Sequence, residues 1–298
     1  MASWDRDRDA ALRVAAIDYV GRASAASGGT ITRAELEAFT FNGQKIKLID
    51  HSRGIRNPKE LPATLSVLSN PRSKYDDSVG PDGFPRYNIR EGDWNAGDNR
   101  KLHEAYELQV PIIWLQTVTS GRFVATAPVY LVDADQGTGQ YTVAVSTELR
   151  SIYSAETPLE ARYIERSTRQ RLHQPMFRAR VMDAYVERCA ICALGHATLL
   201  DAAHITPDSD VRSVQEVSNG LALCKIHHAA FDANIVGIRP DYVVQVATDL
   251  LDEIDGPMLK HGLQEFHGAG LRQLPRRRRE QPNRDRLETR YAEFLAAS

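Results

Sequence analysis

The chain of 298 residues contains only three cysteines and no apolar run of the length that a membrane helix needs. Three cysteines are too few for a disulfide framework in a chain of this size, and a spanning helix takes about 20 apolar residues. The first twenty residues are acidic and charged, where a secretory signal combines a basic end with an apolar run. We therefore expect a cytoplasmic protein without a membrane partner.

An excess of charge of one sign is also missing, because 37 Lys and Arg residues face 39 Asp and Glu residues and the formal net charge is -2. This balance excludes a uniformly basic surface but allows local basic patches. One patch holds six arginines between positions 162 and 180, and between positions 271 and 290 eight arginines accompany three acidic residues. We expect the second patch to bind phosphate groups through Arg276, Arg277, Arg278 and Arg279.

The three cysteines lie within 36 residues of one another, at spacings that are typical of a metal site. Cys189 and Cys192 form a C-x2-C pair, and Cys224 and His227 form a C-x2-H pair. Four sulfur and nitrogen ligands suit a tetrahedral zinc ion and leave no position open for chemistry. We predict a structural Zn2+ bound by these four residues. His196 is the competing fourth ligand, and three buried free thiols are the alternative to a metal site.

The segment around the cysteines has the pattern of strand, loop, strand and helix. "TLLDAAHI" (198–205) is typical of a strand, 206–220 is a polar loop, and "LALCKIHHAAFDA" (221–233) runs from a short strand into a helix. The motifs "AAHITP", "NGLALC" and "HHAAFD" resemble the HNH nuclease family, whose catalytic unit is a ββα fold that binds one divalent metal ion. The resemblance covers about 189–238.

This resemblance places His204, Asn219 and His228 at the three motif positions. Phosphodiester hydrolysis needs a water that has lost its proton and a cation that neutralises the charge on the phosphate. We predict that His204 is the general base, that Asn219 positions it, and that His228 binds catalytic Mg2+ or another divalent metal. On a helix, successive residues point about 100° apart, so His227 can face the zinc while His228 faces the cleft. Asp232, one turn beyond His228, is either a further metal ligand or a salt-bridge partner.

One position departs from the family pattern. Many members have a His or Asp that binds the metal directly before the first motif His, and Ala203 occupies that position here. Asp201 can replace this ligand only if the strand is irregular, because strict alternation points it away from the face of His204. The alternative is a packed, non-catalytic His204, and the context of the three motif positions favours the catalytic role.

The first half of the chain predicts helices over 5–25 and from about 30, and a hairpin around Asn42-Gly43. The runs 110–118, 121–134 and 140–146 then predict a three-strand meander of a small barrel. We therefore expect an α+β protein. Its domains are an N-terminal SRA-like β-barrel of the PUA superfamily with flanking helices (1–155) and a zinc-stapled ββα-metal nuclease domain (156–298). A basic linker helix starts the second domain, and a helix that Asn283 caps ends it.

The barrel assignment comes from a second resemblance. "YDD" (75–77), "YN" (87–88) and "GDNRKL" (97–102) resemble SRA domains, which bind methylated cytosine. The resemblance implies that Tyr75 and Tyr87 sandwich a flipped base and that Asp77, or alternatively Asp76, accepts a hydrogen bond from the cytosine amino group. Asn88 then lines the pocket through its backbone. Each aromatic face offsets roughly 1–3 kcal/mol of lost stacking, and a carboxylate rejects thymine, which has no amino group.

Two features of this region remain open. The glycine-rich run that follows the second tyrosine in SRA domains is replaced by "IREGDW". Within it, Trp94 either stacks on DNA or, more simply, packs in the core.

The two resemblances together imply a modification-dependent SRA-HNH restriction endonuclease. One domain binds double-stranded DNA that carries 5-methylcytosine or 5-hydroxymethylcytosine, and the other cuts it. Because one HNH site cuts one strand, cleavage of both strands predicts either a homodimer, which we favour, or two separate encounters with the DNA. The alternatives are a non-specific HNH nuclease and a modified-DNA binder that does not cleave, and Ala203 favours the latter.

Overall fold

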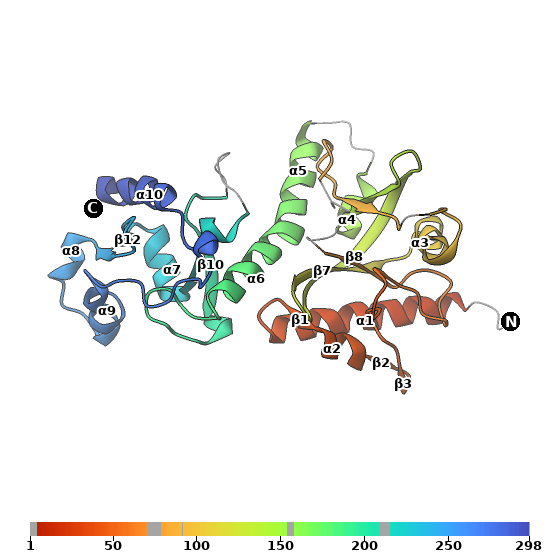
Figure 1. Cartoon of the computed structure of the whole chain (residues 1–298), viewed down its shortest axis with the longest axis horizontal. Coiled ribbons are helices and arrows are strands. Elements are labelled where there is room, and N and C mark those ends of the chain that lie inside the picture. Colours follow the sequence, from red (N-terminus) through yellow and green to blue (C-terminus); the bar gives the residue numbers. More distant parts are fainter. Residues whose placement is uncertain (1–4, 71–78, 91, 154–157, 209–214, 298) are drawn as a thin grey trace. The chain divides into compact units, whose positions relative to one another are not determined.

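The computed structural model describes residues 5–70, 79–90, 92–153, 158–208 and 215–297. The chain forms two compact units, Met1–Met176 and Phe177–Ser298, and both combine helices and strands (Figure 1). This confirms the mixed α+β class. Among the described helices, none combines the length and the apolar character that crossing a bilayer requires.

The first unit is built on one sheet with the strand order β4-β5-β7-β8-β9-β6, and β1 pairs with β8 outside this path. Neighbouring strands are antiparallel except β5 and β7, which are parallel. The predicted meander is confirmed as β7-β8-β9. The strands are β1 (Ile31–Thr32), β4 (Ile55–Arg56), β5 (Ser66–Ser69), β6 (Arg86–Asn88), β7 (Ile112–Thr119), β8 (Arg122–Asp135) and β9 (Gln140–Ala144).

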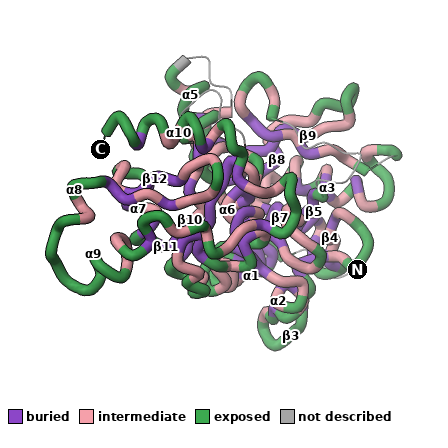
Figure 2. Tube along the Cα trace, turned by 60° about the vertical axis from the view of Figure 1, so that its left-hand side comes forward, coloured by how far each residue is buried: buried purple, intermediate pink, exposed green. Residues whose placement is uncertain are grey.

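Strand β7 is buried on both faces because its apolar residues do not alternate with polar ones. Ile113 and Leu115 join one core cluster, which also contains apolar residues of α1 and α2. Ile112 and Trp114 join the other, together with residues of α3, α4 and α5. Successive side chains of a strand point to opposite faces, so helices cover the sheet on both sides. The buried stretches of β7 and β8 are purple in Figure 2. The helices are α1 (Arg6–Ala26), α2 (Arg33–Ala38), α3 (Gly97–Glu107), α4 (Thr147–Ser151) and α5 (Pro158–Thr168).

Local signals in the sequence set the first elements. Asp5 caps α1 by accepting hydrogen bonds from two backbone N–H groups, and Thr32 and Glu35 form a capping box at α2. The predicted Asn-Gly hairpin joins β2 (Thr40–Phe41) to β3 (Gln44–Lys45). Both turn residues have positive φ, 49° at Asn42 and 75° at Gly43, as a type I′ turn requires.

Helix α1 is fixed to the sheet through a buried arginine that composition does not reveal. The Arg13 side chain is 1% exposed, pairs with Asp9 at 2.9 Å, and donates to the carbonyls of Thr64 and Pro111. A buried charge is tolerated only when its donors are satisfied, and removing one partner of such a pair typically costs about 3–5 kcal/mol. Asp9 therefore stabilises the fold of the first unit by pairing with the buried charge of Arg13.

The second unit contains the strand-loop-strand-helix segment that the sequence predicts. β10 and β11 pair antiparallel over five residues, from Leu200 opposite Cys224 to His204 opposite Gly220, and α7 follows directly. After α7, β12 and β13 pair antiparallel and two short helices follow. The elements are α6 (Gln174–Ala184), β10 (Leu200–His204), β11 (Gly220–Cys224), α7 (Lys225–Asp232), β12 (Val236–Ile238), β13 (Val244–Val246), α8 (Thr248–Leu251), α9 (Pro257–Gly262) and α10 (Arg284–Ala297).

Helix α6 packs directly on the hairpin because Gly220 has no side chain. A Cβ at this position would lie 2.5 Å from Cγ2 of Val181 and 2.9 Å from Cζ of Phe177. The linker segment before α6 belongs to the first unit instead, where α5 and the π-helical stretch Arg169–His173 contribute Ile164 and Leu172 to the core.

Candidate metal centre and catalytic loop

The four predicted zinc ligands lie together in the second unit. The ligand atoms of Cys189, Cys192, Cys224 and His227 are all within 4.8 Å of one another. Nδ1 of His227 lies 3.1 Å from Sγ of Cys224 and 3.5 Å from Sγ of Cys189. Zinc–sulfur bonds of about 2.3 Å and zinc–nitrogen bonds of about 2.0 Å fit inside such a cluster. This Cys3His cluster can bind a zinc ion.

The surroundings of His227 favour this use. Its Nε2 donates to the carbonyl oxygen of Gly262 at 2.9 Å, so the proton is on Nε2 and the lone pair of Nδ1 faces the thiols. Hydrogen bonds with Cys189 raise the pKa of Cys192 and lower that of Cys224. Cys192 therefore keeps its proton more strongly than Cys224 does, and a bound cation would displace that proton. The competing ligand His196 is exposed and pairs with Thr198.

His204 is the last residue of β10, and its ring is held by packing. The ring stacks on Phe177 with centroids 3.9 Å apart and planes 11° apart. Its Nε2 is buried and has no hydrogen-bond partner within the described residues. A buried imidazole nitrogen without a partner is costly in a purely structural role, and it remains available to accept a proton.

Electrostatics keep His204 neutral. Burial lowers its pKa below the usual 6.5, whereas Asp208 and the side chain of Gln215 act in the opposite direction. The charge of His228 lowers the same pKa and that of Asp232 raises it, so these two side chains of α7 lie within electrostatic reach of His204. A neutral imidazole is the form that takes a proton from water.

Asn219 is completely buried and holds the backbone that follows His204. Its Oδ1 accepts from the N–H of Thr206 at 2.9 Å, and its Nδ2 donates to the carbonyl of Thr206 at 3.2 Å. Its own carbonyl accepts from the N–H of Ile205 at 2.8 Å. These bonds fix the backbone directly after His204, and the positioning role of Asn219 stays a prediction.

His228 lies between two carboxylates on the outer side of α7. Its Nδ1 is 3.5 Å from Oδ2 of Asp201, and its Nε2 is 3.3 Å from Oδ2 of Asp232. Strand β10 is regular, so Asp201 does not join the face of His204, yet it reaches His228 across the hairpin. Burial alone would raise the pKa of Asp201, but Lys225 and His228 lower it, and the group is ionised. Imidazole and carboxylate are suitable ligands for a divalent cation.

The basic run at 276–279 is exposed along its whole length. Arg277 pairs with Glu280 at 3.0 Å, while the other three arginines form no ion pair with any residue that the structure describes. The run is therefore accessible to an anionic ligand. Downstream, Asn283 caps α10 as predicted, because its Oδ1 accepts from the N–H of Arg286 at 3.0 Å.

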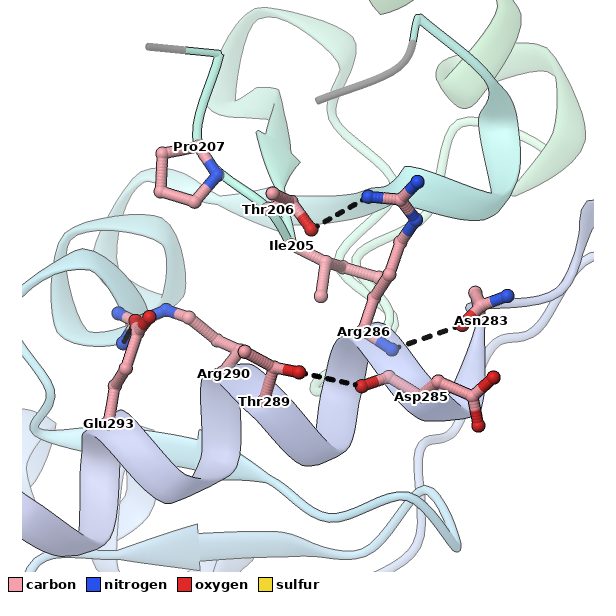
Figure 3. Close-up of a pocket in the computed structure, with 9 residues that line it drawn as sticks. All are labelled: Ile205, Thr206, Pro207, Asn283, Asp285, Arg286, Thr289, Arg290 and Glu293. Atoms are coloured by element: carbon pink, nitrogen blue, oxygen red, sulfur yellow. Dashed lines mark hydrogen bonds and ion pairs between the residues drawn. The ribbon is translucent and has the colours of Figure 1, made fainter. Parts of the chain in front are cut away.

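A cavity of about 320 Å³ separates the segment after His204 from α10 (Figure 3). Ile205, Thr206 and Pro207 form one wall, and α10 contributes the other. Arg286 crosses between the walls and donates to Oγ1 of Thr206 at 2.9 Å.

The first unit has its own pocket of about 420 Å³, and residues of strands β5 and β6 and of the segments next to them line it. One wall is the segment from Asp50 to Gly54, and the other includes the predicted base-binding residues Tyr87 and Asn88. Tyr87 is 5% exposed, packs edge-on against Trp114, and donates to the carbonyl of Gly54 at 3.4 Å. The predicted pocket residues Tyr75, Asp76 and Asp77 lie outside the described residues.

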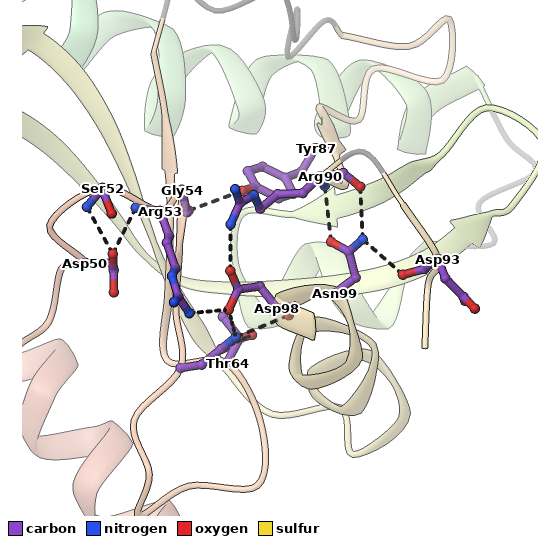
Figure 4. Close-up of polar contacts among 11 residues, drawn as sticks. Asp50, Ser52, Arg53, Gly54, Thr64, Tyr87, Arg90, Asp93, Asp98 and Asn99 are labelled. Atoms are coloured by element: carbon purple, nitrogen blue, oxygen red, sulfur yellow. Dashed lines mark hydrogen bonds and ion pairs between the residues drawn. The ribbon is translucent and has the colours of Figure 1, made fainter. Parts of the chain in front are cut away.

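The start of α3 holds both pocket walls (Figure 4). Asp98 pairs with Arg90 at 2.7 Å and with Arg53 at 3.4 Å. Asn99 is buried, accepts from the N–H of Arg90 at 3.2 Å, and donates to its carbonyl at 2.9 Å. Nearby, Trp94 is half-buried and packs edge-on against Tyr141, with ring centroids 4.9 Å apart, which agrees with the core interpretation.

A family model described as HNH endonuclease matches residues 189–239. The chain carries an HNH endonuclease domain. It is therefore a nuclease, and both the Cys3His cluster and the His204, Asn219 and His228 motif lie within the matched segment.

Other comparisons of this nuclease give distant matches. No curated protein matches the chain. Among solved structures it is similar to "Modification dependent TagI restriction endonuclease", at 15% identity and a TM-score of 0.32, covering 81% of this chain and 85% of that one. It is also similar to "Structure of the Type IV phosphorothioation-dependent restriction endonuclease ScoMcrA", at 13% identity and a TM-score of 0.24. That match covers 58% of this chain and about half, 48%, of the other.

Sequence reasoning missed several residues around the nuclease site. Phe177 and Arg286 lie 27 residues before and 82 residues after His204, and only the fold brings them to it. The sequence indicated part of the position of Arg286. The predicted Asn283 cap places Arg286 in the first turn of α10. Asp208 and Gln215 lie within the polar loop 206–220, where composition does not separate them from their neighbours.

Proposed function

We propose that this nuclease is a modification-dependent restriction endonuclease that cuts double-stranded DNA near 5-methylcytosine or 5-hydroxymethylcytosine. The observation that carries the proposal is the pairing of an HNH endonuclease domain with a pocket lined by Tyr87 and Asn88 in the other unit. The sequence around these two residues, and "GDNRKL" (97–102) at the start of α3, resemble an SRA domain.

In the nuclease site, His204 takes the proton of the attacking water. Its lowered pKa keeps the ring neutral near pH 7, and its unpartnered Nε2 is the acceptor. Asn219 holds the backbone that follows His204, since it bonds both backbone groups of Thr206. Phe177 fixes the ring plane by stacking.

His228 and Asp232 would hold the catalytic cation. Their 3.3 Å approach supplies one nitrogen and one oxygen ligand, while Asp201 orients the ring from Nδ1. Asp232 then provides the carboxylate that the family pattern would place at Ala203. When bound, the cation neutralises charge on the phosphate and on the leaving oxygen. Zinc, in contrast, has a structural role at the Cys3His cluster.

The pocket at Tyr87 accepts the flipped base. A volume of about 420 Å³ is sufficient for one nucleobase, and the walls are held rigidly by Asp98 and Asn99. Tyr87 supplies one aromatic face, and Tyr75 is proposed for the other, with Asp77 or Asp76 at the amino group. Arg276–Arg279 bind backbone phosphates, and two chains act as a homodimer to cut both strands.

The test is digestion of paired plasmids, one carrying 5-methylcytosine and one unmodified, with Mg2+, Mn2+ and no added metal. We expect cleavage of the modified plasmid only, and only with metal. Cleavage of both plasmids alike would leave a non-specific HNH nuclease, and binding of modified DNA without cleavage under any metal would leave a binder.

Matched variants separate the two sites. His204→Ala should abolish cleavage and retain binding, whereas His196→Ala, an exposed histidine outside the cluster, should cut normally. Tyr87→Phe keeps an aromatic face and should retain the preference for modified DNA. Tyr87→Leu removes the face at similar burial and should lose that preference while cutting persists.

A further inference from the structure

Helix α10 and its cap residue Asn283 lie outside the matched nuclease segment. They contact the chain at two points, directly after His204 and directly before Asn219. Arg286 donates to Oγ1 of Thr206 at 2.9 Å, two residues after His204. The N–H of Asn283 donates to the carbonyl of Ser218 at 2.9 Å, directly before Asn219. The first turn of α10 thus touches the chain next to the proposed base and next to the residue that positions it.

The same helix is anchored to α7, which carries His228. Arg290 donates to the carbonyl of Phe231 at 2.6 Å, and its guanidinium lies 4.8 Å from the centroid of the Phe231 ring. On β12, Gly237 leaves room for Phe294 of α10, whose ring atoms come within 2.6 Å of the position of a Cβ there. Because α10 is packed against α7 and β12, the backbone of Arg286 is held in place. Its guanidinium can therefore hold Thr206 in a defined position.

We propose that Arg286 is a positioning residue of the nuclease, which sets His204 through the hydroxyl of Thr206. The proposal rests on the proposed role of His204 as general base. Asn219 already bonds the backbone N–H and carbonyl of Thr206. The parts of Thr206 that can still move are its side chain and the backbone toward Pro207. The bond from Arg286 removes that freedom and ties the loop to α10.

Direct binding of DNA phosphate is the competing role for this arginine, and the lining of the cavity disfavours it. Two acidic residues, Asp285 and Glu293, line the same 320 Å³ space as Arg286 and Arg290 (Figure 3), and Glu293 pairs with Arg290 at 3.3 Å. The lining therefore has no excess of positive charge to attract a phosphate. The guanidinium is only half-exposed and is already bonded to a neutral hydroxyl. A positioning residue should lower kcat, whereas a phosphate ligand should raise KM.

The experiment measures single-turnover and steady-state cleavage by the full-length protein and by six variants. Arg286→Ala removes the donor, Thr206→Val removes the acceptor at nearly the same shape, and the double variant closes a mutant cycle. Arg286→Lys and Thr206→Ser are the conservative variants. Arg284→Ala is the matched control, because this arginine of the same turn lies over the ring of Tyr242 instead.

We expect Arg286→Ala and Thr206→Val each to lower kcat by roughly 10- to 100-fold with KM little changed, because small misplacements of a catalytic group carry losses of this size. The double variant should lose no more than either single one. Arg286→Lys and Thr206→Ser should recover part of kcat, and Arg284→Ala should leave it unchanged. A raised KM at unchanged kcat, additive losses, or no loss in either single variant would overturn the proposal.

A second readout keeps this proposal separate from the proposed function. The ring signals of His204 are followed by NMR in the intact protein, and Arg286→Ala and Thr206→Val should shift them alike while Arg284→Ala does not. If His204→Ala still cuts DNA, the assignment of the general base fails, but the ring shifts still decide whether Arg286 positions His204. Unshifted ring signals in both variants would contradict the positioning role.

Discussion

Asn219 holds Thr206 at both polar groups of its backbone, accepting from the N–H at 2.9 Å and donating to the carbonyl at 3.2 Å. Asn99 holds Arg90 in the same manner, at 3.2 and 2.9 Å. Irregular backbone has no ladder partner, and a buried carboxamide supplies one acceptor and one donor in its place. Both units therefore fix the loop beside their proposed site with an asparagine that is itself buried.

Asn219→Asp tests this arrangement in the nuclease unit. The aspartate can still accept from the N–H of Thr206, but it loses the donor and faces the carbonyl of Thr206 with a negative oxygen. We expect a loss of about 1–3 kcal/mol in the free energy of unfolding and at least a tenfold fall in cleavage rate. Thermal unfolding and plasmid digestion measure the two effects. Full activity in a stably folded variant would contradict the positioning role.

Asn99→Asp is the matching change in the first unit. It should loosen the backbone of Arg90, which lines the proposed base pocket. We expect weaker binding of modified DNA, by about tenfold, with unchanged cleavage chemistry once DNA is bound. Binding isotherms on modified and unmodified duplexes measure this effect. An equal loss of affinity for both duplexes would show that the pocket walls do not read the modification.

Zinc removal should unfold the second unit selectively. Structural zinc contributes on the order of 10 kcal/mol to the folding free energy of small zinc folds. The four ligands connect the Cys189–Cys192 turn to β11 and α7. We expect one zinc ion per chain by elemental analysis. After extraction with a mercurial reagent and chelator, hydrogen exchange should accelerate in β10 and β11 but not in β7 and β8, which belong to a separate core.

Cys224→Ser serves as the genetic version of this experiment, and His196→Ala as its control. The serine variant should purify with less zinc and the same loss of protection, because it removes one of the four ligands. The His196 variant should keep full zinc, since that side chain is exposed and bonded to Thr198. Loss of zinc in the His196 variant would reassign the fourth ligand.

The zinc cluster and the ββα segment follow from the sequence because both depend on short spacings. A C-x2-C pair forms a knuckle by itself, and strand patterns around Leu200 and Leu221 specify a hairpin that brings Cys224 and His227 to it. The Asn42-Gly43 turn and the α2 capping box are local in the same sense.

Other contacts could not be predicted, because they join residues that only the tertiary fold brings together. Strand alternation points Asp201 away from His204, yet Asp201 contacts His228. This contact is possible because His228 lies on helix α7 and not on the strand. The parallel pairing of β5 with β7 and the buried Arg13 are also nonlocal. No periodicity specifies such contacts, and each requires the packed structure.

The pH dependence of cleavage should reflect the neutral state of His204. Burial lowers its pKa below 6.5, so the active, neutral ring persists as the pH falls through 6.5 and is lost only at a lower pH. A bound cation would shift the pKa in the same direction. We expect the acidic limb of the cleavage rate to lie below pH 6.5 and to move with the charge of Asp208.

Asp208→Asn makes the sign of this effect testable. The carboxylate of Asp208 raises the pKa of His204, so its removal should move the acidic limb to still lower pH. The amide oxygen can still accept from Nε2 of Gln215, as Oδ1 does now at 2.6 Å. Rate profiles of both proteins are compared at saturating metal. A limb that moves upward would mean that another group controls the rate.

Replacement of Arg276, Arg277, Arg278 and Arg279 by glutamine should weaken DNA binding without changing the preference for modified DNA. Each arginine that neutralises a phosphate contributes about 0.9 to the slope of log K against log salt. Arg277 is already paired with Glu280, so we expect the slope to fall by roughly 3 and not by 4. Arg277→Gln alone should then change the slope least. Equal effects of all four single variants would show that Glu280 releases Arg277 when DNA binds.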